Sequence, residues 1–183
     1  MLSSLSQDCT HSCIIYLSFL RRENVDLIGD CRFGGGIQVA DAWHWGFDHL
    51  VLAVDDLDAA SEFYEEIGFK LTPRAQHPFG TGNRLVQLQG CFLELLGVTQ
   101  PEDIPPDNDN VFNFGAYNQD YLTRGQGLSM IVLQTKDAAA DRKDFSAEGL
   151  ETYDLFNFSR LAELPDGSKV TVGFTLAFTA EID

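Results

Sequence analysis

The feature that most constrains the fold of this chain is an internal repeat. When Leu50 is placed on Met130, an offset of 80 positions, DHLVLAVDDLDAASEFYEEIGFK matches LSMIVLQTKDAAADRKDFSAEGLE in kind. Each copy predicts a strand, a charged turn, an alanine-rich helix, a glycine and another strand. Two copies of one β-α-β-β-β unit indicate an α+β fold with a pseudo-symmetric pair of sheets and a cleft between them.

The first copy occupies residues 46–98. Asp56 or Asp58 can cap its helix, and Gly68 can end it, because short polar side chains favour helix starts and glycine favours helix ends. The expected elements of this module are a strand over 47–54, a helix over 57–67, a second strand over 69–74 and a hairpin that turns at Gln89–Gly90.

Three further segments follow from composition and periodicity. Residues 1–45 form an N-terminal extension, with one expected strand at 13–20, where the run CIIYLSFL is apolar. Residues 99–126 begin with a Pro- and Asp-rich linker and continue into a helix whose aromatic side chains serve as packing anchors. Residues 127–183 form the second module, which looks incomplete because its last strand is missing.

Charge and cysteine content exclude several classes of function. The formal net charge of -16 argues against binding to nucleic acid or to an anionic membrane, which requires clustered Lys and Arg; acidity of this kind favours solubility. The run at 13–20 is too short to span a bilayer. The four cysteines contain no C-x-x-C pair, so we expect reduced thiols and a cytoplasmic location. Cys9, His11 and Cys13 lie close enough to hold a metal, or are free thiols in a loose terminus.

Glu94 is the most informative polar residue, because a carboxylate on an apolar strand is costly to bury. Glu94 lies two residues from both Phe92 and Leu96, so the three side chains point to the same face of a strand. We expect this face to line a cavity. His49 lies in the first strand and is the expected partner of Glu94 in a shared pocket. The alternatives are a hydrogen-bonded core histidine and a structural ion pair of Glu94 with His49 or Arg84.

The loop between the second and third strands is the expected ligand-binding segment. Its glycines permit a tight turn, which can direct polar groups into the cleft. Such groups suit an anionic or carbonyl-bearing small molecule, although a plain hairpin connection with surface charge explains the same pattern. The candidate ligand-binding residues are His77, Thr81, Asn83 and Arg84.

Together these segments resemble a known family. FDHLVLAVDDLDAASEFYEEIGF, HPFGTGNRLVQL, FLELLGV, GLSMIVL and LPDGS are similar to glyoxalase-like members of the vicinal oxygen chelate superfamily, which includes glyoxalases, bleomycin resistance proteins and extradiol dioxygenases. The resemblance covers residues 46–180. It implies paired half-barrel modules, a homodimer, and a divalent metal held by His or Glu side chains from the first and last strands of each module.

Carried over to this chain, the resemblance implies that His49 and Glu94 are the metal ligands of the first module, suited to Fe, Mn, Ni or Zn. It also implies a catalytic role for these two residues, with Glu94 as a general base if no metal is bound. The second module departs from the family pattern, because Ser129 stands where a histidine is expected and the last strand is missing. Two ligands are fewer than the usual three of a catalytic metal site.

An unpaired sheet edge in the second module needs a cover. We expect the segment 13–20 of the same chain, or a strand from a second subunit, to supply it. The leading functional hypothesis is a protein that binds a small oxygenated or anionic molecule in the cleft with an incomplete metal site. The alternatives are a metal-dependent lyase, isomerase or dioxygenase of the same superfamily, and a remnant that only folds.

Overall fold

The computed structural model describes residues 9–17, 46–163 and 167–179, without the side chains of 9–17, 162 and 163. No helix in these ranges is long and apolar enough to cross a membrane. The elements are β1 (Cys9–Leu17), β2 (Gly46–Ala53), α1 (Leu57–Glu66), β3 (Ala75–Gln76), β4 (Thr81–Gln87), β5 (Phe92–Val98), the short 3-10 helix η1 (Pro101–Asp103), α2 (Phe114–Arg124), β6 (Gly127–Gln134), α3 (Ala138–Ala147), β7 (Phe156–Glu163) and β8 (Lys169–Thr179).

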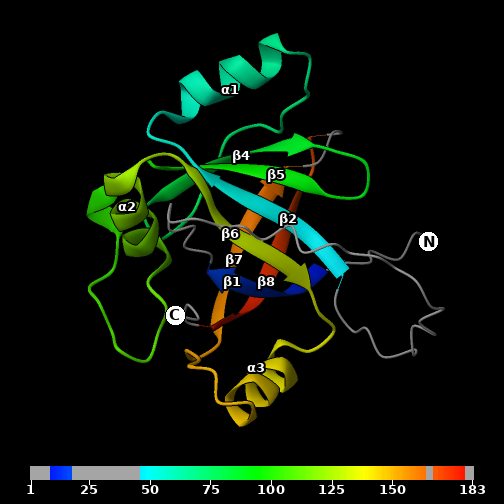
Figure 1. Ribbon diagram of the computed structural model, residues 1–183. Helices are drawn as coiled ribbons and strands as arrows, with labels where there is room; N and C mark the ends of the chain where they lie inside the picture. The colour runs from blue at the N-terminus through cyan, green and yellow to red at the C-terminus, as the bar shows by residue number, and fades with distance from the viewer. Residues whose placement is uncertain (1–8, 18–45, 164–166, 180–183) are drawn as a thin grey trace, which may run out of the picture.

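The eight strands of the described residues form one mixed sheet in the order β3-β4-β5-β2-β6-β1-β8-β7. The first strands of the two modules, β2 and β6, pair antiparallel at its centre, so the two half-sheets are continuous. The sheet curls so that β4 and β5 lie across its concave side from β7 and β8, while α1 and α3 lie at opposite ends of the molecule (Figure 1). This arrangement confirms the expected α+β fold with two curled modules around a shared cleft.

The two module helices begin in the same way, and their starts fix the register of the repeat. Asp56 accepts hydrogen bonds from the second and third backbone N–H groups after it, and Asp137 does the same at the start of α3. These N-caps are 81 positions apart, so the offset of 80 was wrong by one residue. Met130, not Ser129, therefore corresponds to His49.

The neighbours of these two residues agree with the corrected register. Met130 is fully buried in the same hydrophobic cluster as Val51, its cross-strand partner. Ser129 belongs to the alternate set of side chains, and its hydroxyl donates to the carbonyl oxygen of Val51 at 3.4 Å. Ser129, which the offset of 80 placed at the position of His49, therefore forms a hydrogen bond with the backbone.

Strand β1 occupies the place of the last strand of the second module. In the first module β5 lies between β2 and β4, parallel to β2 and antiparallel to β4. In the second module β1 lies between β6 and β8, antiparallel to β6 and parallel to β8. Thus the N-terminal segment fills the equivalent position with the opposite chain direction. It overlaps the expected strand at 13–20 over residues 13–17, and 18–20 lie outside the described residues.

The hydrophobic residues separate onto the two faces of the sheet. Leu95 and Val86 face outward and pack against Leu57 of α1, in a cluster beneath that helix. Leu96 faces the other way and belongs to a larger concave cluster, which includes Phe114 of α2. This alternation is what the period of two in a half-buried strand predicts.

The expected second strand at 69–74 is shorter than predicted. Only the isolated bridge between Leu71 and Val86, and the two residues of β3, pair with β4 in this region. Pro73 interrupts the segment, because proline has no N–H group to donate to a strand ladder. The hairpin between β4 and β5 does turn at Gln89–Gly90, where Gly90 has a φ of 81°.

Candidate small-molecule binding site

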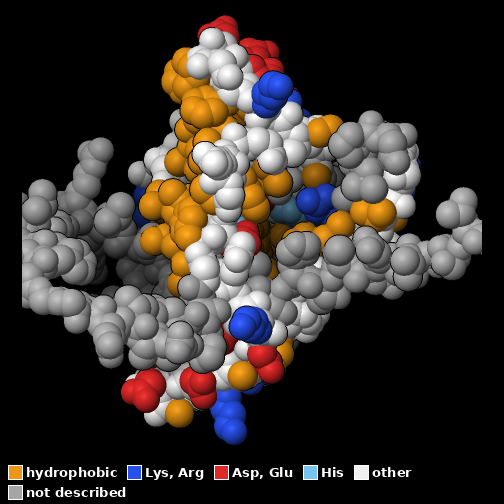
Figure 2. Space-filling model, turned by 90° about the vertical axis from the view of Figure 1, so that its right-hand side faces the viewer, with side chains coloured by type: hydrophobic (Ala, Val, Ile, Leu, Met, Phe, Trp, Pro, Cys, Tyr) orange, Lys and Arg blue, Asp and Glu red, His pale blue; other side chains and the backbone are white. Residues whose placement is uncertain are grey.

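A cavity of about 400 Å³ opens on the concave side of the sheet. This volume is within the range of small-molecule sites, about 300–1,000 Å³. Figure 2 shows a hollow framed by hydrophobic side chains, with a histidine and a basic side chain inside it. The lining side chains are Asp48, His49, Val51, His77, Phe79, Asn83, Leu85, Phe92, Glu94, Phe114, Val132, Gln134, Phe158, Arg160, Val172, Phe174 and Leu176.

Aromatic rings form much of the cavity wall. Phe158 of β7 stacks on Phe174 of β8 with ring centroids 4.7 Å apart. Phe79 meets Phe158 edge to face at 5.2 Å, and Phe114 of α2 meets Phe79 in the same way. Paired rings hold one another in place and present flat apolar surfaces. The wall therefore suits a ligand with a flat or branched apolar body.

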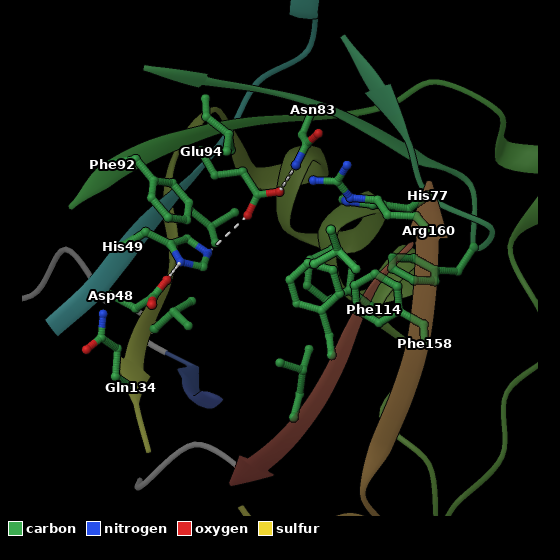
Figure 3. A pocket seen from close by; sticks show the side chains of 17 residues that line it. Asp48, His49, His77, Asn83, Phe92, Glu94, Phe114, Gln134, Phe158 and Arg160 are labelled. Carbon is green, nitrogen blue, oxygen red and sulfur yellow. Dashed lines mark hydrogen bonds and ion pairs between the residues drawn. The ribbon is translucent and has the colours of Figure 1, made fainter. Parts of the chain in front are cut away.

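At one side of the cavity, Glu94 lies at the centre of a polar array (Figure 3). Its Oε2 is 3.2 Å from Nε2 of His49, and its Oε1 accepts a hydrogen bond of 2.5 Å from Nδ2 of Asn83. The other ring nitrogen of His49, Nδ1, is 2.6 Å from Oδ1 of Asp48. Phe92 stacks on the His49 ring at 4.3 Å. The structure thus brings together three of the predicted site residues, His49, Asn83 and Glu94.

The two central residues stabilise one another in their charged forms. Burial alone would lower the pKa of His49, but the hydrogen bonds to Asp48 and Glu94 outweigh it and raise the pKa to about 9. Burial alone would raise the pKa of Glu94, but the hydrogen bond and charge of His49, with a smaller contribution from Asn83, hold it below its ordinary value. At neutral pH the array is an imidazolium between two carboxylates.

His77 lies on the other side of the cavity and is neutral at neutral pH. Burial lowers its pKa; Glu94 acts against this shift, and Arg160 adds to it. Its Nδ1 is 2.8 Å from Oγ1 of Thr81, which is how the predicted residue Thr81 contributes to the site. Gly80, with a φ of 87°, allows the tight turn between them.

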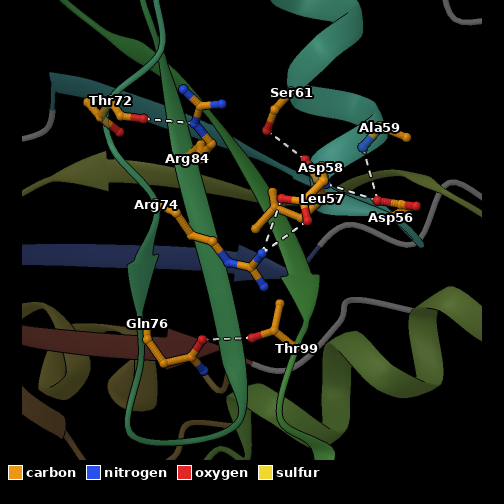
Figure 4. A network of polar contacts seen from close by, with 10 residues as sticks. All are labelled: Asp56, Leu57, Asp58, Ala59, Ser61, Thr72, Arg74, Gln76, Arg84 and Thr99. Atoms are coloured by element: carbon orange, nitrogen blue, oxygen red, sulfur yellow. Dashed lines mark hydrogen bonds and ion pairs between the residues drawn. The ribbon is translucent and has the colours of Figure 1, made fainter.

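Arg84 does not line the cavity. Its guanidinium binds Glu65 of α1 at 2.7 Å and the carbonyl oxygen of Thr72 at 2.8 Å, on the outer face of the sheet. Figure 4 shows Arg84 turned toward Thr72, beside the helix. Residues 81–87 form a strand, so Arg84 and its neighbour Asn83 must point to opposite faces. The predicted ligand-binding residues are therefore divided between the two faces, and Arg84 is not among those facing the cavity.

Sequence reasoning missed Arg160, which lines the cavity from β7. Its guanidinium lies over the ring of Phe174, with 5.9 Å between Cζ and the ring centroid. The available signal was alternation: Phe158 and Arg160 are two apart in FNFSR, so they share a face if the segment is a strand. Gln134 and Asp48 also line the cavity and were not predicted.

The described residues do not supply a complete metal site. His49 and Glu94, the two expected ligands, do lie together. No group of three or more His, Cys, Asp or Glu side chains that could hold a metal ion occurs within the described ranges. Met130, at the corresponding position of the second module, is buried in the hydrophobic core, so the described residues offer two ligands where three are usual. This donor set therefore does not fit a catalytic divalent metal.

Comparison with known proteins identifies the fold. The model of the glyoxalase-like domain family matches residues 47–183. Among solved structures, a hypothetical protein from Staphylococcus aureus has a TM-score of 0.56 and 23% identity, covering 76% of this chain and 54% of that chain. Methylmalonyl-CoA epimerase from Streptomyces coelicolor, in complex with 2-nitronate-propionyl-CoA, has a TM-score of 0.49 and 24% identity, covering 75% and 96%.

Methylmalonyl-CoA epimerase from Mycobacterium tuberculosis has a TM-score of 0.47 and 19% identity, covering 74% of this chain and 89% of that chain. No curated protein matches the chain. The family match extends over most of the sequence and includes both modules and the polar array. The chain belongs to the glyoxalase-like domain family of the vicinal oxygen chelate superfamily.

Proposed function

We propose that this protein binds a small organic molecule with an apolar body and an oxygen-containing polar group, without a metal ion in the contact. The observation that carries this proposal is the self-contained array of His49, Glu94 and Asn83 at one side of an aromatic cavity. Each oxygen of Glu94 already has a donor, so the carboxylate is stable there without a metal ion. The array then serves to orient a ligand that the aromatic walls hold.

The wall supplies affinity and the polar atoms supply orientation. Burying an apolar ligand against rings such as Phe114 and Phe158 contributes roughly 25 cal/mol per Å² removed from water. The few polar groups inside the cavity then select the ligand whose own donors and acceptors match them, which is the usual composition of a small-molecule site.

A metal-dependent lyase, isomerase or dioxygenase is the second candidate. The observation that favours it is the distance of 3.2 Å between Nε2 of His49 and Oε2 of Glu94, a spacing that two ligands of one ion can also have. Metal analysis separates the candidates. We expect untagged protein to contain far less than one equivalent of Fe, Mn, Ni or Zn, and these ions to leave the melting temperatures of wild type and Glu94→Gln unchanged. Stoichiometric metal that is lost in Glu94→Gln would favour the enzyme.

The binding function can be tested with N-phenyl-1-naphthylamine, a neutral probe whose fluorescence rises in apolar sites. Leu85 lines the cavity, whereas Leu88 lies in the exposed β4–β5 turn, so Leu85→Trp and Leu88→Trp are a matched pair. We expect saturable binding by wild type and Leu88→Trp, and at least tenfold weaker binding by Leu85→Trp, because indole fills the cavity. Near-ultraviolet circular dichroism checks that both variants are folded. Equal binding by the two variants would contradict the proposal.

A further inference from the structure

Arg160 differs from the other described arginines in having no carboxylate partner. Four of the five arginines with described side chains form ion pairs with Asp or Glu. Arg160 forms none within the described residues, although the chain has 28 acidic and 12 basic residues. Its Nε is buried and has no hydrogen-bond partner in the part of the chain that the structure describes. A buried guanidinium nitrogen without an acceptor is costly, so this position needs a partner that the described residues do not supply. The four pairs are Arg74–Asp58, Arg84–Glu65, Arg124–Asp120 and Arg142–Asp154.

The surroundings of Arg160 hold its guanidinium at the cavity. It extends from β7 on the same face as Phe158, and its Cζ lies 5.9 Å from the centre of the Phe174 ring. Figure 3 shows it beside His77, across the cavity from His49. An aromatic ring beneath a guanidinium limits its motion and leaves its N–H edge free for an acceptor.

The rest of the cavity directs an anion toward this residue. The positive charge of His49 is already compensated, because Asp48 and Glu94 flank it at 2.6 and 3.2 Å. Both oxygens of Glu94 are already engaged, by Asn83 and by His49, so this side of the cavity offers no free donor to a second anion. His77, beside Arg160, is neutral and brings no opposing charge. Among the described residues Arg160 is thus the one Arg or Lys side chain that lines the cavity, and it has no carboxylate partner there.

We infer that Arg160 determines ligand specificity by binding the carboxylate, or a similar oxyanion, of a monoanionic ligand whose apolar body lies between the aromatic walls. The planar guanidinium presents paired N–H groups that match the two oxygens of such a head group. This inference rests on the proposed function and adds the chemical class of the ligand.

The test uses two probes that differ in one charged group. 8-Anilinonaphthalene-1-sulfonate is N-phenyl-1-naphthylamine with a sulfonate added. Their affinities are measured by fluorescence titration for wild type, Arg160→Gln and the control Arg84→Gln, which removes an arginine from the outer face. We expect wild type and Arg84→Gln to prefer the anionic probe. Arg160→Gln should weaken its binding by about tenfold or more, as for a lost charge-assisted hydrogen bond, and leave the neutral probe within twofold.

Competition with 1-naphthoate and 1-naphthamide then tests the carboxylate directly. The acid should compete better than the amide with wild type, and the two should compete equally with Arg160→Gln. Arg160→Met, which keeps the apolar stem, replaces Arg160→Gln if circular dichroism shows that the latter is unfolded. Unchanged anion affinity in the folded Arg160 variant would overturn the inference while leaving the proposed function intact. Failure of both probes to bind wild type would overturn both.

Discussion

The polar array at His49 makes the stability of this fold depend on pH in a defined direction. The hydrogen bonds to Asp48 and Glu94 raise the pKa of His49 from 6.5 to about 9 in the folded chain. In the unfolded chain the imidazole has its ordinary pKa. Between these two values the folded state binds more protons than the unfolded state, so the free energy of unfolding must fall as pH rises.

The expected magnitude follows from the size of the shift. One pKa unit corresponds to about 1.36 kcal/mol, so protonated His49 contributes about 3 kcal/mol to stability. This contribution is fully present below about pH 6.5 and is lost as pH rises through about 9. Because the side chain of His49 is 14% exposed, solvent screening removes little of it.

Urea denaturation followed by circular dichroism, at half-unit steps from pH 6 to pH 10, measures this contribution. His49→Gln is the control, because glutamine still donates to Glu94 and does not titrate. The difference between the two proteins cancels the titration of Tyr, Lys and Cys elsewhere. We expect the free energy of unfolding of wild type, measured relative to that of His49→Gln, to fall by about 3 kcal/mol from pH 6 to pH 10. A difference that stays constant within roughly 0.5 kcal/mol would refute the reasoning.

Three further perturbations test other parts of the structure. Glu94→Leu should lower the free energy of unfolding by about 3–5 kcal/mol in a urea titration at pH 7, because the buried charge of His49 keeps only Asp48 as a partner. A loss below roughly 1 kcal/mol would contradict the ion pair. Gly80→Ala should cost more stability than Gly90→Ala: both have a positive φ, but a Cβ at Gly80 would lie 2.7 Å from a backbone oxygen, whereas nothing lies within 4 Å at Gly90. Ile15→Pro should cost about 3 kcal/mol or more in thermal melts, since proline cannot donate within a central strand, and an unchanged melting temperature would argue against the pairing of β1.

The centre of the candidate site could be predicted from sequence because it depends on local alternation. Phe92, Glu94 and Leu96 are alternate residues of one strand, and the structure places all three on the concave face. The same rule applied to residues 81–87 separates Asn83 from Arg84. The prediction treated that segment as a loop, and this is why it grouped the two side chains together.

Arg160 could not be predicted because its role depends on distant pairing. Its strand has an alternating sequence, but alternation alone does not say which of the two faces is concave. That choice follows from the register of β7 against β8, where Phe158 lies opposite Phe174. The prediction would also need to know which arginines form ion pairs with carboxylates. Those pairs join residues up to 19 positions apart in the sequence.

Strand β1 links the two halves of the candidate site, and this gives the N-terminal segment a role beyond covering an edge. His49 and Glu94 lie on the part of the sheet that ends at β6, whereas Arg160 and Phe174 lie on the hairpin of β7 and β8. Among the described strands only β1 joins these two parts of the sheet, with hydrogen bonds to β6 on one side and to β8 on the other. Strand β1 therefore helps to set the spacing between the array and the arginine within the sheet. Loss of β1 pairing should weaken anion binding even where both ends of the cavity keep their side chains.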